Sequence, residues 1–443
     1  MAPLIDENRS YWMATAAPVE PLPRLPGNID ADVAVIGAGF TGMSTAWYLS
    51  QRYPDKRIVV LEAGVVANGA SGRNGGLMLN WINGVHLEDP EGCRAVYAAT
   101  RDGIDGIERL IREERLPVRY HRDGAMELYT SAARAEEAHA RVEKLRSWGI
   151  PVEYLHGQAL SGRLRAQGAL GAIFDPTAGQ LHGVDLLRAL TPRLLARGVS
   201  IHEYTPVLAV EEGKTIRLTT PHGEVRAAAI VLGTSAYTPK LGYFRNTIFP
   251  LHSHVFATEP LDEARRGALG WGATAGFNDD LDRIAYGSIA ADGSVVFGGG
   301  SNASYSYLYG NKTVYPGLPD SAAGAYAAIE GTFRKYFPTA DGVRIAHRWT
   351  GTIGVTFARV CTMGVRGAHK NVYYALGYSG HGVTLANLAG RVLTDLYSDH
   401  HEPWRALPFY QRRMAFIPPE PLRWLGYQMI TRVTGRSPRR VEY

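Results

Sequence analysis

The chain has 443 residues, of which 45% are hydrophobic and 20% are charged, and its formal net charge is +5. This length exceeds what one hydrophobic core normally supports, so we expect two closely connected domains. The positive charge is not gathered into a Lys/Arg block or a basic stripe with interleaved aromatic residues, which argues against a nucleic-acid partner. The only cysteines, Cys93 and Cys361, form no CxxC pair. We therefore expect no metal site, no disulfide framework and a reduced, cytoplasmic setting.

The first 30 residues predict an irregular lead-in, because Pro18, Pro21, Pro23 and Pro26 interrupt regular structure. The N-terminal sequence lacks a basic segment followed by an apolar run, so we expect no secretory signal. No stretch reaches the roughly 18 apolar residues that a membrane-spanning helix needs.

A strand–turn–helix–strand unit follows the lead-in. An apolar strand at 32–36 leads into a GxGxxG turn at 37–42, a helix over 41–52 and a second apolar strand at 57–62 that ends in an acid. The first glycine permits a tight turn, the second lets the backbone approach a pyrophosphate, and the third lets the helix pack on the strand. The helix N-terminus offers N–H groups to the phosphates, and the acid binds ribose hydroxyls. The residues assigned to this dinucleotide site are Gly37, Gly39, Phe40, Thr41, Gly42, Glu62 and Ala63.

Two further glycine-rich stretches favour a flavin over a nicotinamide cofactor. GASGRNGG at 69–76 follows the acid and lets the backbone lie flat against a planar ligand, while GYSGHGV at 377–383 precedes the last long helix. That helix N-terminus would face the pyrimidine edge of the flavin and stabilise the negative charge of the reduced ring. An ordinary turn is the alternative for each stretch. The assigned residues are Gly69, Ala70, Ser71, Arg73, Asn74, Gly75, Gly76, Gly377, Gly380, His381, Gly382, Val383 and Thr384.

The two ends of the chain each supply a strand, a glycine turn and a helix. This pattern predicts an α/β fold with a discontinuous Rossmann-like FAD-binding domain and an inserted β-rich substrate domain. We expect helices at 88–115, 131–148, 184–198, 321–336 and 383–397, and strands at 118–130, 200–210, 215–220, 225–232, 371–376 and within 245–305. The predicted division is a lead-in at 1–30, an FAD-binding domain at 31–85, 150–240 and 355–400, a substrate domain at 86–149 and 241–354, and a C-terminal tail at 401–443.

The tail contains an amphipathic stretch from Leu422, LRWLGYQMITR, followed by an Arg-rich end. We expect this helix to pack against the body of the protein. Contact with a membrane surface is the less favoured alternative.

The three glycine motifs, in this order, resemble the D-amino-acid-oxidase-like superfamily of FAD enzymes, and within it the branch that oxidises gamma-glutamylated diamines. Further matching stretches are ATEP at 257–260, FGGG at 297–300 and RWTG at 348–351. The resemblance implies that Val207 contacts the adenine side and that Gly233, Thr234 and Gly354 contact the cofactor. It also implies active-site roles for Trp349, Tyr378, His381 and His254. The alternative for the two aromatic residues is packing in the core. The alternative for His381 is capping of the helix, and for His254 it is a core or surface position.

The resemblance implies oxidation of a small-molecule amine by hydride transfer to flavin N5, with hydrolysis of the resulting imine to an aldehyde. Sarcosine-oxidase relatives bond the flavin through a cysteine, which the stretch around Trp349 lacks, so we expect non-covalent FAD. Related oxidases place a lysine near flavin N5 to activate oxygen, and the strand at 294–298 has no lysine. Two alternatives follow. Either another group, such as His254, supplies the positive charge for reaction with oxygen, or the enzyme passes its electrons to a different acceptor.

Amino-acid oxidases of this superfamily carry an arginine in a Trp-x-Gly-x-Arg stretch that holds the substrate carboxylate. This chain has Ile353 at that position, which predicts a substrate without a carboxylate on the reacting carbon, such as a gamma-glutamylated diamine. Arg73 or Arg359 approaching from elsewhere is the alternative, and the enzyme would then oxidise an amino acid or an N-methyl amino acid. A flavin-binding subunit without turnover is a further alternative, and an NAD-dependent dehydrogenase is a weaker one.

Overall fold

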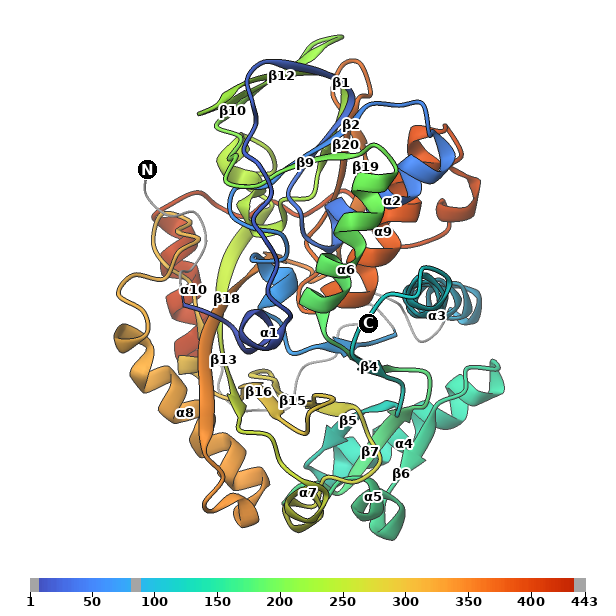
Figure 1. Ribbon diagram of the computed structural model, residues 1–443. Coiled ribbons are helices and arrows are strands. Elements are labelled where there is room, and N and C mark those ends of the chain that lie inside the picture. Colours follow the sequence, from blue (N-terminus) through green and yellow to red (C-terminus); the bar gives the residue numbers. More distant parts are fainter. Residues whose placement is uncertain (1–7, 81–88, 434–443) are drawn as a thin grey trace.

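The computed structural model describes residues 8–80 and 89–433, and the Arg-rich end of the predicted tail lies outside these residues. Within them, an eight-stranded sheet forms the upper part of the molecule in Figure 1 and a nine-stranded sheet forms the lower part, with a three-stranded sheet beside them. The arrangement is a mixed α/β fold.

The eight-stranded sheet has a parallel centre that the predicted βαβ unit begins. Its central strands are short buried runs such as IVVL in β2, as expected for parallel strands covered on both faces. Strands from the two ends of the chain meet here, because β12 pairs in parallel with both β1 and β20. The parallel order is β9 (Ser200–His202), β2 (Ile58–Leu61), β1 (Ile29–Ile36), β12 (Gly223–Leu232) and β20 (Val372–Leu376), and the antiparallel flanks are β10 (Ala209–Glu211), β11 (Ile216–Thr220) and β19 (Thr362–Arg366).

Two helices, α2 (Phe40–Arg52) and α9 (Gly382–Tyr397), pack closely beside this sheet (Figure 1). Ser44 Oγ donates to the Asn387 carbonyl at 2.6 Å, and a Cβ on Gly390 would lie 2.4 Å from the Ser44 carbonyl carbon. Each helix follows a glycine turn at the carboxyl end of a parallel strand. Their N-termini therefore open at the same edge of the sheet, where α/β folds bind ligands.

The nine-stranded sheet forms the β-rich part. Its core includes Phe256 and Phe297, which pack against Phe333 of helix α8 (Ala323–Tyr336). The order is β17 (Tyr305–Ser306), β13 (Ile248–Thr258), β16 (Val295–Gly299), β15 (Ala285–Ile289), β14 (Gly276–Asp279), β5 (Ala125–Tyr129), β7 (Gly171–Asp175) and β6 (Glu153–Leu155), with β18 (Ile345–Thr356) on the other edge of β13.

The sheet pairing of residues 153–175 differs from the predicted division, which groups them with the FAD-binding domain. β6 and β7 pair with each other, and β7 pairs with β5. Their sequence carries no long periodic signal, and helix α5 (Gly157–Arg163) separates them. The remaining elements of this half of the chain are α4 (Ala132–Ser147), α6 (Gly183–Ala196), α7 (Glu263–Leu269) and the small sheet of β3 (Leu77–Met78), β8 (Gly179–Leu181) and β4 (Tyr120–His121).

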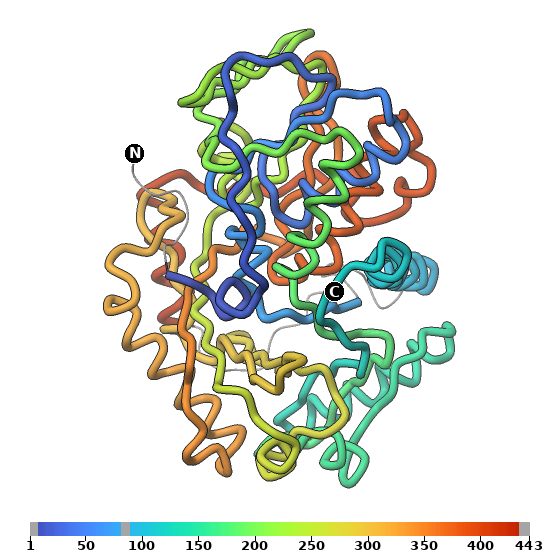
Figure 2. Tube along the Cα trace, in the orientation of Figure 1, coloured from blue at the N-terminus to red at the C-terminus, as the bar shows by residue number. Residues whose placement is uncertain are grey.

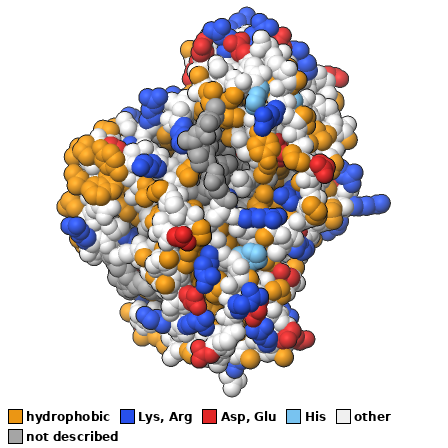
Figure 3. Space-filling view, turned by 60° about the vertical axis from the view of Figure 1, so that its left-hand side comes forward, with side chains coloured by type: hydrophobic (Ala, Val, Ile, Leu, Met, Phe, Trp, Pro, Cys, Tyr) orange, Lys and Arg blue, Asp and Glu red, His pale blue; other side chains and the backbone are white. Residues whose placement is uncertain are grey.

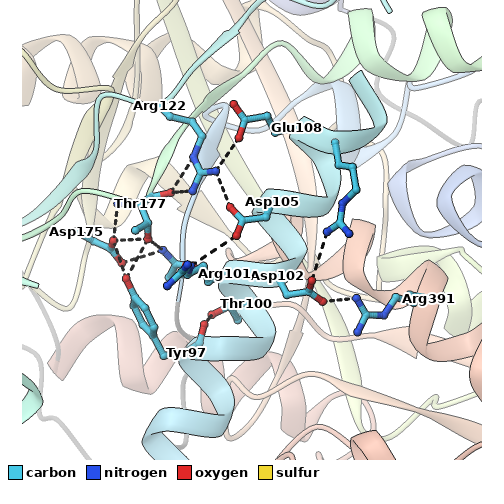
Figure 4. Close-up of polar contacts among 12 residues, drawn as sticks. Tyr97, Thr100, Arg101, Asp102, Asp105, Glu108, Arg122, Asp175, Thr177 and Arg391 are labelled. Carbon is cyan, nitrogen blue, oxygen red and sulfur yellow. Dashed lines mark hydrogen bonds and ion pairs between the residues drawn. The ribbon is translucent and has the colours of Figure 1, made fainter. Parts of the chain in front are cut away.

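Helix α3 (Pro90–Glu113) joins the two parts of the molecule through polar contacts along its length (Figure 4). Tyr97 donates to Asp175 at the end of β7 at 3.1 Å, and Asp102 forms an ion pair with Arg391 of α9. Arg122 bonds two acids of the helix, Asp105 at 2.6 Å and Glu108 at 2.9 Å. These contacts fix the β-rich part relative to α9, the helix that begins at the third glycine motif.

The lead-in contains a short helix, α1 (Tyr11–Thr15), that the proline-rich sequence around it does not suggest. Ser10 caps the helix by accepting from Met13 N at 3.1 Å, and the Trp12 side chain is buried. Trp12 Nε1 donates to the carbonyl of Asn74, in the second glycine loop, at 2.7 Å. The chain then runs from α1 up the molecule to the eight-stranded sheet (Figure 2). The lead-in therefore braces the predicted flavin loop.

The C-terminal helix α10 (Leu422–Val433) packs against the body of the protein, as predicted for the tail. Its buried Arg423 donates to the Arg245 carbonyl at 3.0 Å, and Tyr427 Oη donates to the Tyr305 carbonyl at 3.1 Å. Leu422, Met429 and other apolar residues of the helix are exposed. In Figure 3, which brings the left-hand side of Figure 1 forward, hydrophobic side chains form several groups and basic side chains are interspersed with acidic ones. Within the described residues, no helix is long and apolar enough to cross a membrane.

Candidate functional site

A cavity of about 820 Å³ opens at the sheet edge where α2 and α9 begin and continues to the nine-stranded sheet. All three glycine motifs reach it, although they are far apart in the sequence. The predicted residues that line it are Gly37, Gly39, Phe40, Thr41, Glu62, Ala63, Gly69, Ala70, Ser71, Arg73, Asn74, Gly75, Gly76, Val207, Gly233, Thr234, Gly354, Tyr378, Gly380, His381, Gly382 and Val383. The predicted residues that do not line it are Gly42, Gly377, Thr384, Trp349 and His254. Direct binding by any of these residues stays a prediction.

The first glycine motif has a structural requirement for each of its glycines. Gly37 has a φ of +101°, and a Cβ there would lie 2.9 Å from the Gly233 carbonyl oxygen. Gly42 lies behind the cavity wall, where a Cβ would come within 1.9 Å of the Gly37 oxygen, so its role is helix–strand packing. Gly39 is the N-cap of α2 and lines the cavity. The N-terminus of α2 therefore opens at the cavity, where its positive dipole end attracts a phosphate.

Glu62 follows β2 and lies buried at the cavity wall. Its two carboxylate oxygens accept from the backbone N–H groups of Ala38 and Gly64, both at 2.8 Å. Burial raises the pKa of this carboxyl, and the backbone hydrogen bonds oppose the rise. Each oxygen has a second lone pair. The side chain is thus fixed in place and retains capacity to accept from ribose hydroxyls.

The second glycine loop is joined to the first motif and to the β-rich part. Ser71 Oγ accepts from Phe40 N at the start of α2 at 2.9 Å. Arg73 lines the cavity, and its guanidinium donates to the carbonyls of Asn68 and Asn8, both at 2.8 Å, and of Thr350 at 3.0 Å. This guanidinium therefore holds the loop, and the backbone of the loop faces the cavity.

The third glycine motif begins α9. His381 is the N-cap of the helix and lines the cavity with Gly382 and Val383. Tyr378 is buried, and its hydroxyl lies 2.7 Å from Thr41 Oγ1 in the first turn of α2. Burial raises the pKa of Tyr378 far above its ordinary value, so the phenol is neutral at physiological pH. The tyrosine ties the N-termini of the two helices together.

The alternation of β13 explains why His254 is outside the cavity. Phe249, Leu251 and Ser253 line the cavity, so His252 and His254 point to the opposite face of the strand. His254 is fully buried, and its Nδ1 lies 2.8 Å from Thr350 Oγ1. Burial lowers the pKa of this histidine to about 4, so it is neutral at pH 7.

Trp349 is likewise buried, and it contributes to the site indirectly. Its Nε1 donates to the Arg73 carbonyl at 3.0 Å, which anchors the second glycine loop. Ile353, four residues further along β18, does line the cavity. The position that the sequence comparison with amino-acid oxidases identifies is therefore part of the cavity wall, and its side chain is apolar.

Several cavity residues were not predicted from the sequence. Phe249, Leu251 and Ser253 alternate along the sequence with a period of two, which shows that they share one face of a strand. The sequence does not show that this face borders the cavity, because that depends on how the strand is placed in the sheet. Lys240 is the one lysine among the described residues that lines the cavity, and burial lowers its pKa. Further cavity residues come from loops, strand ends and α10, and include Asn278, Asp282, Arg283, Ile284, Tyr286, Tyr305, Tyr427 and Ile430.

These features fit an FAD molecule. The cavity has a helix N-terminus for phosphates, a fixed acid for a ribose, a glycine-rich loop and a second helix N-terminus, all in one continuous space. Neither Cys93 nor Cys361 lines the cavity, so no thiol is placed to bond the ring. Among the described residues, no group of three or more His, Cys, Asp or Glu side chains is placed to hold a metal ion.

Comparisons with known proteins agree with this geometry. The sequence model of the DAO family, described as FAD dependent oxidoreductase, matches residues 32–396. Gamma-glutamylputrescine oxidoreductase of Escherichia coli (strain K12) is 27% identical over 420 residues, which cover 92% of this chain and 93% of that protein. Monomeric sarcosine oxidase of Arthrobacter sp. (strain TE1826) is 23% identical over 83% of this chain and 92% of its own length. The crystal structure of glycine oxidase from Geobacillus kaustophilus aligns with a TM-score of 0.72 at 19% identity, covering 87% of this chain and 99% of that one. This likeness confirms the predicted fold class.

Proposed function

This chain belongs to the DAO family of FAD-dependent oxidoreductases, and from that premise we propose that it oxidises the C–N bond of an amine whose reacting carbon carries no carboxylate. The family assignment confirms the prediction of an FAD enzyme. A gamma-glutamylated diamine is the substrate that we favour. The name of the E. coli relative is consistent with this choice.

The observation that carries the proposal is the apolar side chain of Ile353 in the cavity wall. An isoleucine cannot donate a hydrogen bond, and a buried carboxylate without a partner costs several kcal/mol. Arg73, one alternative carboxylate clamp, directs its guanidinium to three backbone carbonyls instead. A substrate with no carboxylate at the reacting carbon avoids this cost.

Bound FAD would accept a hydride from the carbon beside the amine nitrogen, and the resulting imine hydrolyses to an aldehyde. The chain contributes binding and orientation. The N-terminus of α9 lies at the cavity, and its backbone N–H groups would stabilise negative charge on a bound flavin ring. Tyr286 and Ile353 line the cavity, and beside a bound substrate these side chains would help to exclude water.

The test is anaerobic mixing of the FAD-loaded protein with single amines while the flavin absorbance is recorded. The panel contains gamma-glutamylputrescine, putrescine, glycine, sarcosine and simple D- and L-amino acids. We expect rapid bleaching with gamma-glutamylputrescine and slow or no bleaching with the α-amino acids. Efficient reduction by a free α-amino acid would contradict the proposal.

Amino-acid or N-methyl amino-acid oxidation is a second candidate, because Arg359 also lines the cavity. Its guanidinium would then hold the carboxylate by two parallel hydrogen bonds. In that case Arg359→Met would raise the KM for sarcosine or glycine at least about 10-fold, as expected for loss of a charged hydrogen bond. Under the favoured proposal, the same variant has the KM of the wild type for gamma-glutamylputrescine.

A further inference from the structure

A row of tyrosines lines the cavity beyond the second glycine loop, on the side away from the dinucleotide motifs. A Cβ on Gly75 would lie 2.8 Å from the Tyr286 ring, so this tyrosine packs directly on the loop assigned to the flavin ring. Tyr286 Oη lies 3.3 Å from Ser253 Oγ. Tyr305 is the next aromatic side chain of the wall, and its hydroxyl donates to the Ile284 carbonyl at 3.0 Å.

Asp282 and Arg283 lie in the wall beyond these tyrosines, in the turn between β14 and β15. Both side chains are half-buried. Arg283 Nε donates to Asn302 Oδ1, and the Asn302 amide donates to the Thr431 carbonyl of α10 at 3.1 Å. Arg283 and Asn302 therefore link this turn to α10.

Helix α10 completes this end of the cavity. Tyr427 and Ile430 line it, and Tyr427 Oη donates to the Tyr305 carbonyl at 3.1 Å. Burial raises the pKa of Tyr427 to about 12, and the nearby positive charge of Arg283 opposes that rise. An acid, a guanidinium and a neutral phenol thus share one end of a cavity whose other walls are largely apolar.

We infer that Asp282, Arg283 and Tyr427 form a subsite for the amino-acid head group of an elongated substrate, with Arg283 binding its carboxylate and Asp282 binding its ammonium group. The inference rests on the proposed function, because it assigns the end of the substrate that does not react. It also accounts for Ile353. The cavity wall is apolar at this position, where an α-amino-acid substrate would need an arginine, and the arginine that binds the carboxylate is instead Arg283 at the far end.

The chemistry of a gamma-glutamylated diamine matches this arrangement. Its glutamyl end carries one carboxylate and one ammonium group on a single carbon, and a planar guanidinium binds a carboxylate with two parallel bonds. Eight bonds separate that carbon from the carbon that reacts, which is roughly 10 Å of extended chain. On this inference, a substrate of this length extends from the flavin loop past Tyr286 and Tyr305 to the turn at 282–283, all of which line one cavity.

Isothermal titration of the FAD-loaded protein tests the subsite without turnover. The probe is gamma-glutamylethylamide, which has the head group and the amide but no terminal amine, and the control ligand is N-ethylacetamide. We expect the wild type to bind the probe at least about 10-fold more tightly than the control. Arg283→Gln should weaken binding of the probe by about 10- to 100-fold, as expected for loss of charge-assisted hydrogen bonds. Asp282→Asn should weaken it less.

The matched control is Arg405→Gln, which removes an exposed arginine that pairs with Glu402 and lies outside the cavity lining. This variant should bind the probe as the wild type does. Equal affinity of wild-type protein for the two ligands would overturn the inference, even if Arg283→Gln fails to fold. Wild-type affinity of Arg283→Gln for the probe would also overturn it.

Kinetics separate this inference from the proposed function. In Arg283→Gln, kcat/KM for gamma-glutamylputrescine should fall about 10- to 100-fold, whereas kcat/KM for N-acetylputrescine, which lacks the head group, should be unchanged. If no amine of the panel reduces the wild-type flavin, the proposed function is wrong. If gamma-glutamylputrescine reduces wild type and Arg283→Gln equally well, only the subsite is wrong.

Discussion

Replacement of Arg73 by methionine distinguishes a structural guanidinium from a substrate clamp. The side chain is 3% exposed and donates to the carbonyls of Asn8, Asn68 and Thr350 at 2.8–3.0 Å. These partners belong to the lead-in, to the residue just before the second glycine loop and to β18. Methionine keeps an unbranched apolar stem but has no donor, so Arg73→Met leaves the three carbonyls without this partner.

The expected loss of stability follows from these contacts. A hydrogen bond to a charged group contributes about 1.5–3 kcal/mol, while removal of the guanidinium also relieves the cost of burying its charge. We expect the free energy of unfolding to fall by about 3–5 kcal/mol, with weaker FAD retention because the flavin loop loses its anchor. Urea unfolding followed by far-UV circular dichroism measures the first effect, and FAD content after gel filtration measures the second.

Arg359→Met is the control, since Arg359 lines the same cavity but is exposed. An exposed substitution of this kind changes the free energy of unfolding by about 0.5 kcal/mol or less. If Arg73→Met unfolds with the free energy of the wild type and instead raises the KM for carboxylate substrates, the assignment of Arg73 as a structural anchor is refuted.

Four further outcomes are expected. Acid precipitation should release the yellow chromophore into the supernatant, and colour retained in the pellet would show a covalent link. Gly39→Val should abolish FAD binding, measured by absorbance, because its Cβ would lie 2.8 Å from Ser71 Oγ and the side chain would occupy the pyrophosphate space. Lys240→Met should slow reoxidation of the reduced flavin by air, whereas His254→Gln should not, because of these two residues only the lysine lines the cavity. Slower reoxidation in His254→Gln alone would instead identify His254 as the group that activates oxygen. Burial lowers the pKa values of His252 and His254 from 6.5 to about 4. In the unfolded chain both histidines bind a proton below about pH 6.5, whereas in the folded chain they stay neutral down to about pH 4, so the folded state loses stability as the pH falls through this range. Thermal unfolding between pH 7 and 4.5 should therefore show a lower Tm at lower pH, and the dependence of Tm on pH should be smaller in His254→Gln.

The nucleotide-binding half was predictable because its backbone conformation and close packing allow only glycine at particular positions. A glycine at 37 is needed for a φ of +101°, and one at 42 for an approach that leaves no space for a Cβ. Such constraints fix residue type and spacing together, so a single sequence reveals them. The lead-in was less predictable. Helix α1 has only five residues, which is too short for a helical pattern of apolar residues, and it is stabilised by a serine cap and by burial of Trp12.

The β-rich half shows where sequence patterns lose information. Alternation along β13 predicts two faces but does not say which face borders the cavity, and the two histidines lie on the face away from it. His254 is a buried neutral side chain, while Phe249, Leu251 and Ser253 form the wall. A strand buried on both faces carries no hydrophobic asymmetry that would resolve the choice.

The substrate end of the cavity depends on convergence of segments that share no motif. Arg283 follows β14, Tyr305 begins β17, and Tyr427 lies in α10, and these are brought together by sheet order and by two hydrogen bonds to backbone carbonyls. Residues of this kind can change without disturbing the cofactor cradle, because their backbone geometry is ordinary. One cofactor frame can therefore serve different amines, and under the proposed function Ile353 and Arg283 are among the residues that select the amine.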